Sequence, residues 1–413
     1  MLNSKVIEFK KDSIIFVTGG IPNTKFYKIL FGSVEEHIYG IHSMVNTYNE
    51  NDIIGIVSAV IGEPYYSTII AKTNVTLLEI DISTLDSLDN SIVSDSVYSE
   101  LIEFLDIWFN KYFDELSYKL HIDHYIEKDA LKIAKIYEEN GHKYTALKMY
   151  KQMKDMFPNE NTDLFNRKIE ELDIDESLYN PSNDICNYLE INDKNLPVPN
   201  VDLCICKPGC CVYSELENSN NIYILKSGTV GIYNIFNNKI VTRMIAEKGS
   251  IIGYRTILGK EYLKTTGIVL EDAQIQIVRK DVFYDLTINN NIVKYHLIKV
   301  ICRRIYNAIT KLYVLNIKSI ISKIYNLLYA LVKTELLFNT NNDIKYVKLE
   351  YKVDDISSML GIFDSDRVKI ELENDKIILI DKTDKIVITD LEKFYQKYEK
   401  LKRLDNDKLS IKS

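Results

Sequence analysis

Short apolar runs separated by turn residues make up the part of the chain from residue 5 to about residue 92. Apolar and polar positions alternate in VIEF, KFYKILFG and VTLLEID, and Gly-Gly, Asn-Glu-Asn-Asp and Gly-Glu-Pro interrupt the runs. A period of two indicates strands, and several short strands at this spacing predict a β-sandwich or barrel. Between residues 94 and 120 the apolar spacing changes to three and four, which predicts a helix that follows this β domain.

The same pattern returns between residues 197 and 288. IYILKSGTVGIYNI parallels FYKILFGSVEEHIY, KGSIIGYRTILG parallels ENDIIGIVSAVIG, and TTGIVLEDAQIQIV parallels YSTIIAKTNVTLLEI. An internal repeat of this length indicates two copies of one structural unit. We therefore expect β domains with the same strand order at 1–120, where the trailing helix is included, and at 197–288.

The segment between the two copies has a different periodicity. Its small and aromatic residues have the spacing of one tetratricopeptide repeat, at Ala134, Tyr137, Gly141, Ala146, Tyr150 and Pro158. Small residues let two antiparallel helices touch, and solenoids usually need about three copies to be stable alone. We interpret residues 121–196 as a helical hairpin that acts as a spacer, followed by an acidic, Asn-containing stretch at 173–195 that includes a linker.

A long amphipathic helix is predicted at 289–316. Its apolar stripe recurs at helical steps and consists of Ile292, Val293, Leu297, Val300, Ile301, Ile305, Ala308, Ile309, Leu312 and Leu315. Lys294, Lys299, Arg303, Arg304 and Lys311 lie largely off this stripe. A helix with one apolar face requires a partner, and we expect a second copy of the chain, with Leu297 and Ile301 in the contact. The alternative is a core helix that lies across its own domain.

The remaining residues, 317–413, predict a compact helical unit. An amphipathic helix at 317–338 precedes two short helices at 353–360 and 364–374, which meet at Gly361. Strands at 376–380 and 385–388 follow. Two short helices joined by a Gly-containing turn and followed by a hairpin are typical of a winged helix-turn-helix.

Composition narrows the class of protein. The chain has 413 residues, 46% of them hydrophobic, and a net charge of −8, which argues against a strongly basic nucleic-acid surface over the whole chain but not against a local one. It contains no apolar run long enough for a membrane span and begins with no signal peptide, so we expect a cytoplasmic protein without a membrane partner. No P-loop, GxSxG or HExxH spacing is present, so we expect no enzymatic activity and assign no catalytic residue.

The six cysteines include a cluster with the spacing C-x-C-x3-C-C, formed by Cys204, Cys206, Cys210 and Cys211. The first two lie on one face of a predicted strand. No second CxxC or nearby His pair completes a metal-ligand set, so we interpret the cluster as core packing and expect no metal site.

The order of parts in residues 197–398 resembles that of the Crp/Fnr superfamily of bacterial regulators. IYILKSGTVGIYN, KGSIIGYRTIL, the long helix and DDISSMLGI carry the likeness, and residues 5–120 resemble a second sensor domain. The resemblance implies an α+β multidomain fold. It would comprise two cyclic-nucleotide-binding-like jelly rolls, a helical hairpin spacer, a long dimerisation helix and a C-terminal winged helix-turn-helix. It further implies signal transduction that ends in transcription control.

The family holds the cyclic phosphate on a short helix, with a Gly-Glu pair and a nearby Arg. Here the pair becomes Gly55-Ile56 and Gly253-Tyr254, and the Arg position falls at about Tyr65 and Leu263. The remaining candidate ligand contacts are Gly55, Ser67 and Thr68 in the first copy and Gly253, Tyr254, Arg255, Lys264, Thr265 and Thr266 in the second. We expect no tight cyclic-nucleotide binding through the usual contacts, and we consider the second copy the better candidate for altered binding. The identity of any small-molecule ligand stays open.

The predicted recognition helix is acidic. Candidate contacts to DNA are Ser365, Arg367, Lys369, Lys382 and Lys385, against Asp364, Asp366, Glu371 and Glu373. Carboxylates facing the groove oppose phosphate binding. Two hypotheses therefore remain: a homodimeric transcription regulator that binds DNA, or an adaptor or regulatory subunit that acts through protein contacts.

Overall fold

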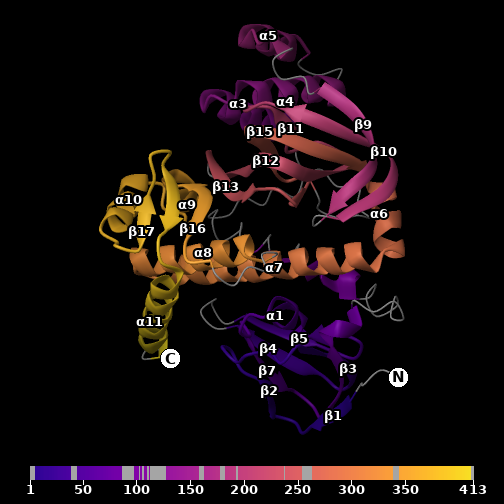
Figure 1. Cartoon of the computed structure of the whole chain (residues 1–413), viewed down its shortest axis with the longest axis vertical. Coiled ribbons are helices and arrows are strands. Elements are labelled where there is room, and N and C mark those ends of the chain that lie inside the picture. Colours follow the sequence, from indigo (N-terminus) through magenta and orange to yellow (C-terminus); the bar gives the residue numbers. More distant parts are fainter. Residues whose placement is uncertain are drawn as a thin grey trace.

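Two β domains and a C-terminal domain are arranged around one long helix in the computed structural model of the chain (Figure 1). The structure describes residues 5–38, 44–85, 97–101, 103–104, 107–108, 111, 127–157, 162–176, 182–191, 194–236, 238–253, 263–337 and 344–410. The expected α+β class with two jelly rolls is confirmed at this level.

The first jelly roll has two four-stranded sheets in its described residues, with strand orders β1-β8-β3-β6 and β2-β7-β4-β5. Its strands are β1 (Lys5–Phe9), β2 (Ile14–Phe16), β3 (Lys25–Phe31), β4 (Val34–Ile38), β5 (Met44–Tyr48), β6 (Ile53–Ile54), β7 (Thr68–Ala71) and β8 (Val75–Asp81). The short helix α1 (Ile56–Ile61) follows β6, and the 3-10 helix η1 (Ile82–Leu85) follows β8. Residues 97–101 and several described residues up to 111 are helical, as predicted for the trailing helix.

The second jelly roll is built from longer, bent strands. They are β9 (Ser182–Ile191), β10 (Lys194–Cys206), β11 (Cys211–Tyr213), β12 (Asn221–Phe236), β13 (Lys239–Ala246), β14 (Ile251–Ile252) and β15 (Thr266–Arg279). Strand β12 pairs with β13, β14 and β15 in the way that β3 and β4 pair with β5, β6, β7 and β8. Strand β15 pairs with β10 and β11 as β8 and β7 pair with β1 and β2. The predicted duplication with one strand order is confirmed.

One glycine in each copy shows why the repeat is visible in the sequence. Gly32 and Gly228 both have positive φ, at +88° and +80°. An added Cβ would lie 2.3 Å from the Asn74 carbonyl oxygen in the first copy and 2.2 Å from that of Asp272 in the second. Only glycine combines this backbone conformation with so close an approach to a neighbouring strand.

The helical hairpin lies against the second jelly roll and does not separate the two copies. Helices α3 (Glu127–Glu139), α4 (Lys143–Met156) and α5 (Thr162–Leu172) share a core with Leu216, Tyr233 and Ile268 of the jelly roll. The helices were predicted, but their role as a spacer was wrong, because the aromatic and small residues of the hairpin also cover the face of this sheet. The expected linker at 173–195 contains β9, which pairs along β10 and extends the second domain.

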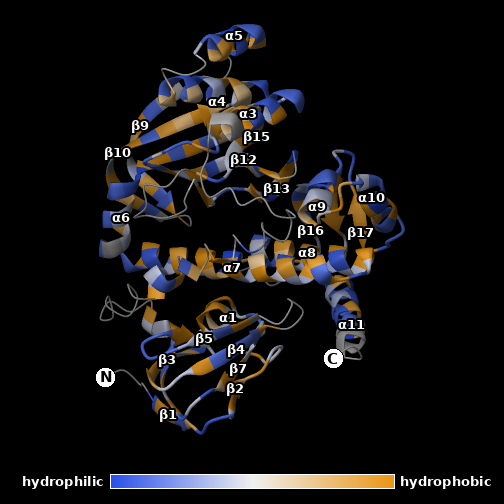
Figure 2. Cartoon of the chain, turned by 180° about the vertical axis from the view of Figure 1, so that it is seen from behind, coloured by the Kyte–Doolittle hydropathy of each residue, from blue (hydrophilic) through white to orange (hydrophobic). Residues whose placement is uncertain are grey.

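The long helix α7 (Asn291–Asn316) runs between the two jelly rolls, and α6 (Lys280–Asn289) leads into it from β15 (Figure 1). Most of its apolar stripe is buried within a single chain: Leu297 and Ile301 are each 1% exposed in a core that includes residues of both jelly rolls, whereas Ile292 at the start of the helix is 44% exposed. Figure 2 shows that apolar residues continue along the whole length of α7. The expectation that Leu297 and Ile301 face a second copy is therefore corrected, because the chain's own first jelly roll supplies a partner.

Three of the charged residues that lie off the apolar stripe are nevertheless buried. Lys294, Arg303 and Lys311 are buried, because α7 is enclosed from two sides and has no single wet face over this length. Each needs a polar partner in the protein, since an unpaired buried charge is costly.

The C-terminal domain, residues 344–410, follows α8 (Ile320–Glu335), which runs beside α7. It contains β16 (Val347–Lys352), α9 (Val353–Met359), α10 (Ser365–Glu373), β17 (Ile378–Ile380), β18 (Lys385–Ile388) and the terminal helix α11 (Leu391–Ser410). The two short helices and the hairpin occur where the sequence predicted them, and β16 adds a third strand to the sheet. Within the described part of the chain, no helix has the length and apolar character needed to cross a membrane.

Candidate functional site

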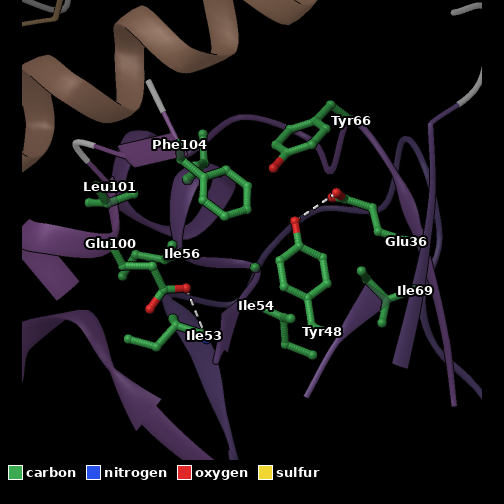
Figure 3. A pocket seen from close by; sticks show the side chains of 12 residues that line it. Glu36, Tyr48, Ile53, Ile54, Ile56, Tyr66, Ile69, Glu100, Leu101 and Phe104 are labelled. Atoms are coloured by element: carbon green, nitrogen blue, oxygen red, sulfur yellow. Dashed lines mark hydrogen bonds between the residues drawn. The ribbon is translucent and has the colours of Figure 1, made fainter. Parts of the chain in front are cut away.

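The first jelly roll contains a small cavity beside α1. Its walls come from β4, β5, β6, α1, the segment before β7 and the trailing helix, through residues that include Glu36, Tyr48, Gly55, Tyr66 and Glu100 (Figure 3). The rest of the lining is apolar and consists of Ile53, Ile54, Ile56, Val57, Ile69, Leu101 and Phe104. The cavity has a volume of about 20 Å³. That is room for roughly one water molecule, so a nucleotide would enter only after side chains move.

A buried carboxylate dominates one end of this cavity. Glu36, which is 3% exposed, accepts hydrogen bonds from the Tyr48 hydroxyl (2.9 Å), the Asn46 amide (2.9 Å) and the Ser67 hydroxyl (2.7 Å). Burial, and then the nearby Glu36 charge, hold the pKa of both Tyr48 and Tyr66 well above the usual value. Both hydroxyls therefore stay protonated, and that of Tyr48 donates to the carboxylate.

The opposite end carries a second acid. Glu100 accepts a hydrogen bond from the Ile53 amide (3.0 Å), and burial raises the pKa of its carboxyl group to about 7. Lys111 lies close enough to Glu36 for their charges to interact. A site lined by two carboxyl groups favours hydrogen-bond donors and disfavours an anion such as a cyclic phosphate.

Of the ligand contacts that the sequence predicted in the first copy, two lie at the cavity and one does not. Gly55 lines the cavity, and Ser67 reaches it through its bond to Glu36. Thr68 points elsewhere and bonds to the amide and hydroxyl of Thr18, both at 3.1 Å. Tyr65, at the family's Arg position, stacks on Phe16 with ring centroids 4.0 Å apart.

In the second copy, two aromatic rings lie beside Gly253, the counterpart of Gly55. Tyr213 and Tyr223 stack at 5.4 Å, and the Tyr223 ring occupies the space where a side chain on Gly253 would project. Thr265 lies close to the Tyr213 hydroxyl. Leu263, at the family's Arg position, is buried.

The other ligand candidates of the second copy have varied positions. The Thr266 hydroxyl is fully buried and accepts a bond from the Glu215 amide (3.1 Å), while Lys264 is half-buried. Tyr254 and Arg255 lie outside the described residues. Three of the candidates, Gly253, Thr265 and Thr266, already contact other groups of the protein. The predicted preference for ligand binding in the second copy stays untested.

The cysteine cluster lies in the core of the second jelly roll. Cys204, Cys206 and Cys210 are buried together with Tyr213, Tyr223 and Ile275, and none of the three forms a disulfide bond. Among the described residues, no group of three His, Cys, Asp or Glu side chains has a metal-binding arrangement.

Consecutive arginines of α7 bind opposite jelly rolls. The Arg303 guanidinium donates two hydrogen bonds to Glu63 of the first jelly roll, at 3.2 and 3.1 Å. Arg304 donates to the Ile251 carbonyl of the second jelly roll at 2.5 Å, and the Lys311 ammonium donates to the Arg243 carbonyl at 2.9 Å. Successive residues of a helix point about 100° apart, which explains how one helix connects both domains.

The C-terminal domain is fixed to the second jelly roll by its first short helix. Thr242 on β13 donates to Asp355 at 2.7 Å and to the Ser358 hydroxyl through its amide at 3.2 Å. The Tyr351 hydroxyl accepts from the Ile245 amide at 3.0 Å. This contact occupies α9 and leaves α10 on the outer side, where Arg367, Lys369 and Ile370 are exposed.

The five predicted DNA contacts are therefore not equivalent. Ser365 is half-buried at the start of α10, and Lys382 is exposed in the turn between β17 and β18. Lys385 instead pairs with Glu271 of the second jelly roll (2.8 Å) and with Glu350. Its ammonium group is therefore already paired with carboxylates of the protein. Glu36 and Glu63 were not among the predicted site residues, because no local sequence pattern indicates that these acids are buried.

Comparisons with known proteins agree with the repeat. Residues 6–91 and 205–290 both match the family model of the cyclic nucleotide-binding domain. This confirms the tandem sensor domains of the expected resemblance. No curated protein matches the chain.

Solved structures with a similar fold include three bacterial proteins. A CooA mutant from Carboxydothermus hydrogenoformans is 18% identical, with 48% of this chain and 88% of that chain covered and a TM-score of 0.38. FixK2 from Bradyrhizobium japonicum is 13% identical, with 48% and 96% covered and a TM-score of 0.38. The global regulator CLP from Xanthomonas campestris is 11% identical, with 46% and 93% covered and a TM-score of 0.37.

Proposed function

We propose that this chain, whose residues 6–91 and 205–290 belong to the cyclic nucleotide-binding domain family, is a cytoplasmic Crp/Fnr-type transcription regulator. Its two jelly rolls are the sensors, and the C-terminal domain is a winged helix that acts on DNA. The observation that carries the proposal is the course of α7, which is bonded to both jelly rolls and leads through α8 into the C-terminal domain. A change in either sensor thus has a path to the same output, as a shift between two arrangements.

We propose that the protein contacts DNA mainly through phosphates and recognises few bases. On α10, Arg367 and Lys369 are exposed beside the carboxylates of Asp364, Asp366 and Glu373, and Ile370 is 57% exposed. Phosphate contacts give affinity, whereas base contacts give specificity. We therefore assign phosphate binding to Arg367 and Lys369 of α10 and to Lys382 of the wing, and we exclude Lys385 because its ammonium is already paired.

Fluorescence anisotropy with a labelled DNA duplex tests this function. We expect salt-dependent binding, and the combined Arg367→Ala and Lys382→Ala changes should lower affinity and reduce the salt slope by about one for each lost phosphate contact. Lys393→Ala is the matched control, since Lys393 is exposed on α11 and pairs with Asp390 at 2.8 Å. Absence of binding at low salt, or an equal loss in the control, would reject the winged helix as a DNA-binding unit and favour protein contacts instead.

The sensors are proposed to work without the usual cyclic-nucleotide contacts. The first cavity has carboxyl groups where an anion would need cations, and in the second copy the Tyr213 and Tyr223 rings stack beside Gly253. Calorimetric titration with cyclic AMP, cyclic GMP and cyclic dinucleotides should give weak or absent heat. Sub-micromolar binding that Ser67→Ala abolishes would show that the first cavity opens and takes such an anion after all.

We still propose a homodimer, but with an interface other than the Leu297 and Ile301 face of α7. Since Leu297 and Ile301 are buried by the chain itself, a dimer of the full chain has to use a different surface. Sedimentation velocity at several protein concentrations measures whether such a dimer forms.

A further inference from the structure

One carboxylate of the first jelly roll is buried at the junction of three other helices. Glu63, in the turn after α1, has a side chain that is 2% exposed, and that of Arg303 on α7 is 4% exposed. Besides the two bonds from Arg303, Glu63 accepts a bond from the Tyr329 hydroxyl of α8 at 2.8 Å, and the Lys333 ammonium lies 3.6 Å away. Arg303 and Tyr329 are 240 and 266 residues away from Glu63 in the sequence.

The contact extends to the C-terminal domain through aromatic rings. Tyr329 stacks on Tyr398 of α11 at 4.0 Å and meets Tyr395 edge-on at 5.9 Å. The Lys333 ammonium lies 5.5 Å from the rings of both Tyr329 and Tyr395. A carboxylate of the first sensor is therefore one side chain away from the last helix of the output domain.

The same short segment closes the cavity of the first jelly roll from its other side. Three residues after Glu63, Tyr66 lines the cavity, and Ser67 donates to Glu36. The Tyr66 ring meets Tyr306 of α7 at 6.2 Å, and the Tyr306 hydroxyl donates to the Pro64 carbonyl at 3.3 Å. One end of this short segment is thus held at the cavity, while Pro64 and Glu63 at its other end are held by α7 and α8.

We propose that residues 62–67 form a latch that couples the first sensor cavity to the output domain. With the latch closed, Glu63 holds α7, α8 and α11 in one arrangement; a change at Glu36 or Tyr66 withdraws Glu63 and releases the C-terminal domain. A buried ion pair suits this role, because it favours one geometry strongly and becomes costly when one partner leaves. The inference deepens the proposed function by naming its control element, but the latch itself does not depend on DNA being the target.

Hydrogen exchange of the full chain tests the latch. Glu63→Gln keeps the volume of the side chain and removes its charge, so amides of α8 and α11 should exchange about tenfold faster or more, while the jelly-roll strands stay protected. Glu79→Gln is the matched control, since Glu79 also pairs with a cation, Lys25, but within the first jelly roll. Tyr329→Phe removes a single hydrogen bond, keeps the ring stacking and should give a smaller change of the same kind.

The cavity side of the latch is tested by Glu36→Gln. The hydrogen bonds of Glu36 in the described part of the chain come from Asn46, Tyr48 and Ser67 and not from α8 or α11, so an effect on these helices would pass through residues 62–67. Faster exchange in α8 and α11 supports the coupling. Unchanged exchange in Glu63→Gln, or an equal increase over the whole chain, would overturn the latch, and an effect of Glu63→Gln without one of Glu36→Gln would overturn its link to the cavity. DNA affinity is measured separately, so failure of the proposed function leaves a distinct result.

Discussion

Glu215 is a buried carboxyl group whose charge state should govern the stability of the second jelly roll. It is 2% exposed, and burial raises its pKa to about 8, although the Ile235 amide donates to it at 3.1 Å. The folded state binds the proton more tightly than the unfolded state, so the stabilisation is complete below the unfolded pKa and is lost as pH rises through the folded value. We expect stability to fall between about pH 4.5 and pH 8 because of this group.

Replacing Glu215 with Gln should remove this part of the pH dependence. The amide oxygen still accepts from Ile235, and no charge has to be buried, so the variant should be more stable than the parent by a few kcal/mol above pH 8 and unchanged near pH 4. Urea unfolding at a series of pH values measures the difference. A parallel shift of the two curves at all pH values would contradict the assignment to Glu215.

Gly228 gives a second prediction at the scale of one residue. Gly228→Ala places a Cβ 2.2 Å from the Asp272 carbonyl oxygen at a φ of +80°, so it should destabilise the protein by about 1–3 kcal/mol through clash and backbone strain. Gly249→Ala is the control, because Gly249 has a φ of +85° and nothing within 4 Å of the added carbon. Thermal unfolding should show a clearly larger loss for Gly228→Ala, and equal losses would mean that the close approach of the two strands is unimportant.

At the scale of elements, α7 shows both the reach and the limit of sequence reasoning. The period of the apolar positions predicted its ends to within a few residues, because periodicity is a local property. The choice between a second copy and the chain itself as its cover was not local, since it depends on where residues 56–66 lie in space. Lys294, Arg303 and Lys311 are buried although they lie off the apolar stripe, and the position of α7 between the two jelly rolls explains this: Arg303 bonds to Glu63 of the first and Lys311 to the Arg243 carbonyl of the second.

The same distinction holds for the sensor cavities. Tyr65 and Leu263 at the family's Arg positions were visible in the sequence, and in the structure Tyr65 stacks on Phe16 while Leu263 is buried. Glu36 and Glu63 looked like ordinary surface acids among many. Their burial follows from partners such as Tyr48, Ser67 and Arg303, which lie on other strands and helices and have no fixed sequence spacing to them.

Charge placed in the middle of α7 should now destabilise the chain rather than split a dimer. Leu297→Asp together with Ile301→Asp removes two side chains that are each 1% exposed and puts carboxylates into the shared core. Each buried Leu or Ile contributes about 1.5–3 kcal/mol, so we expect a large loss of stability in urea unfolding. If sedimentation instead showed a change from dimer to monomer with unchanged stability, a second copy would cover the helix.

For the whole molecule, the arrangement of the two sensor copies predicts what happens when one is removed. Helix α1 of the first jelly roll packs on α7, and Cys302, Arg303 and Tyr306 mark the face of α7 that it covers. A shortened chain that starts at residue 121 loses this cover and exposes an apolar face on a long helix. Such a face tends to pair with a copy of itself.

We expect the shortened chain to dimerise at micromolar concentration in size-exclusion chromatography with light scattering, and Cys302→Asp in that chain should restore the monomer. A shortened chain that stays folded and monomeric would show that the first jelly roll is not what keeps α7 from a second copy.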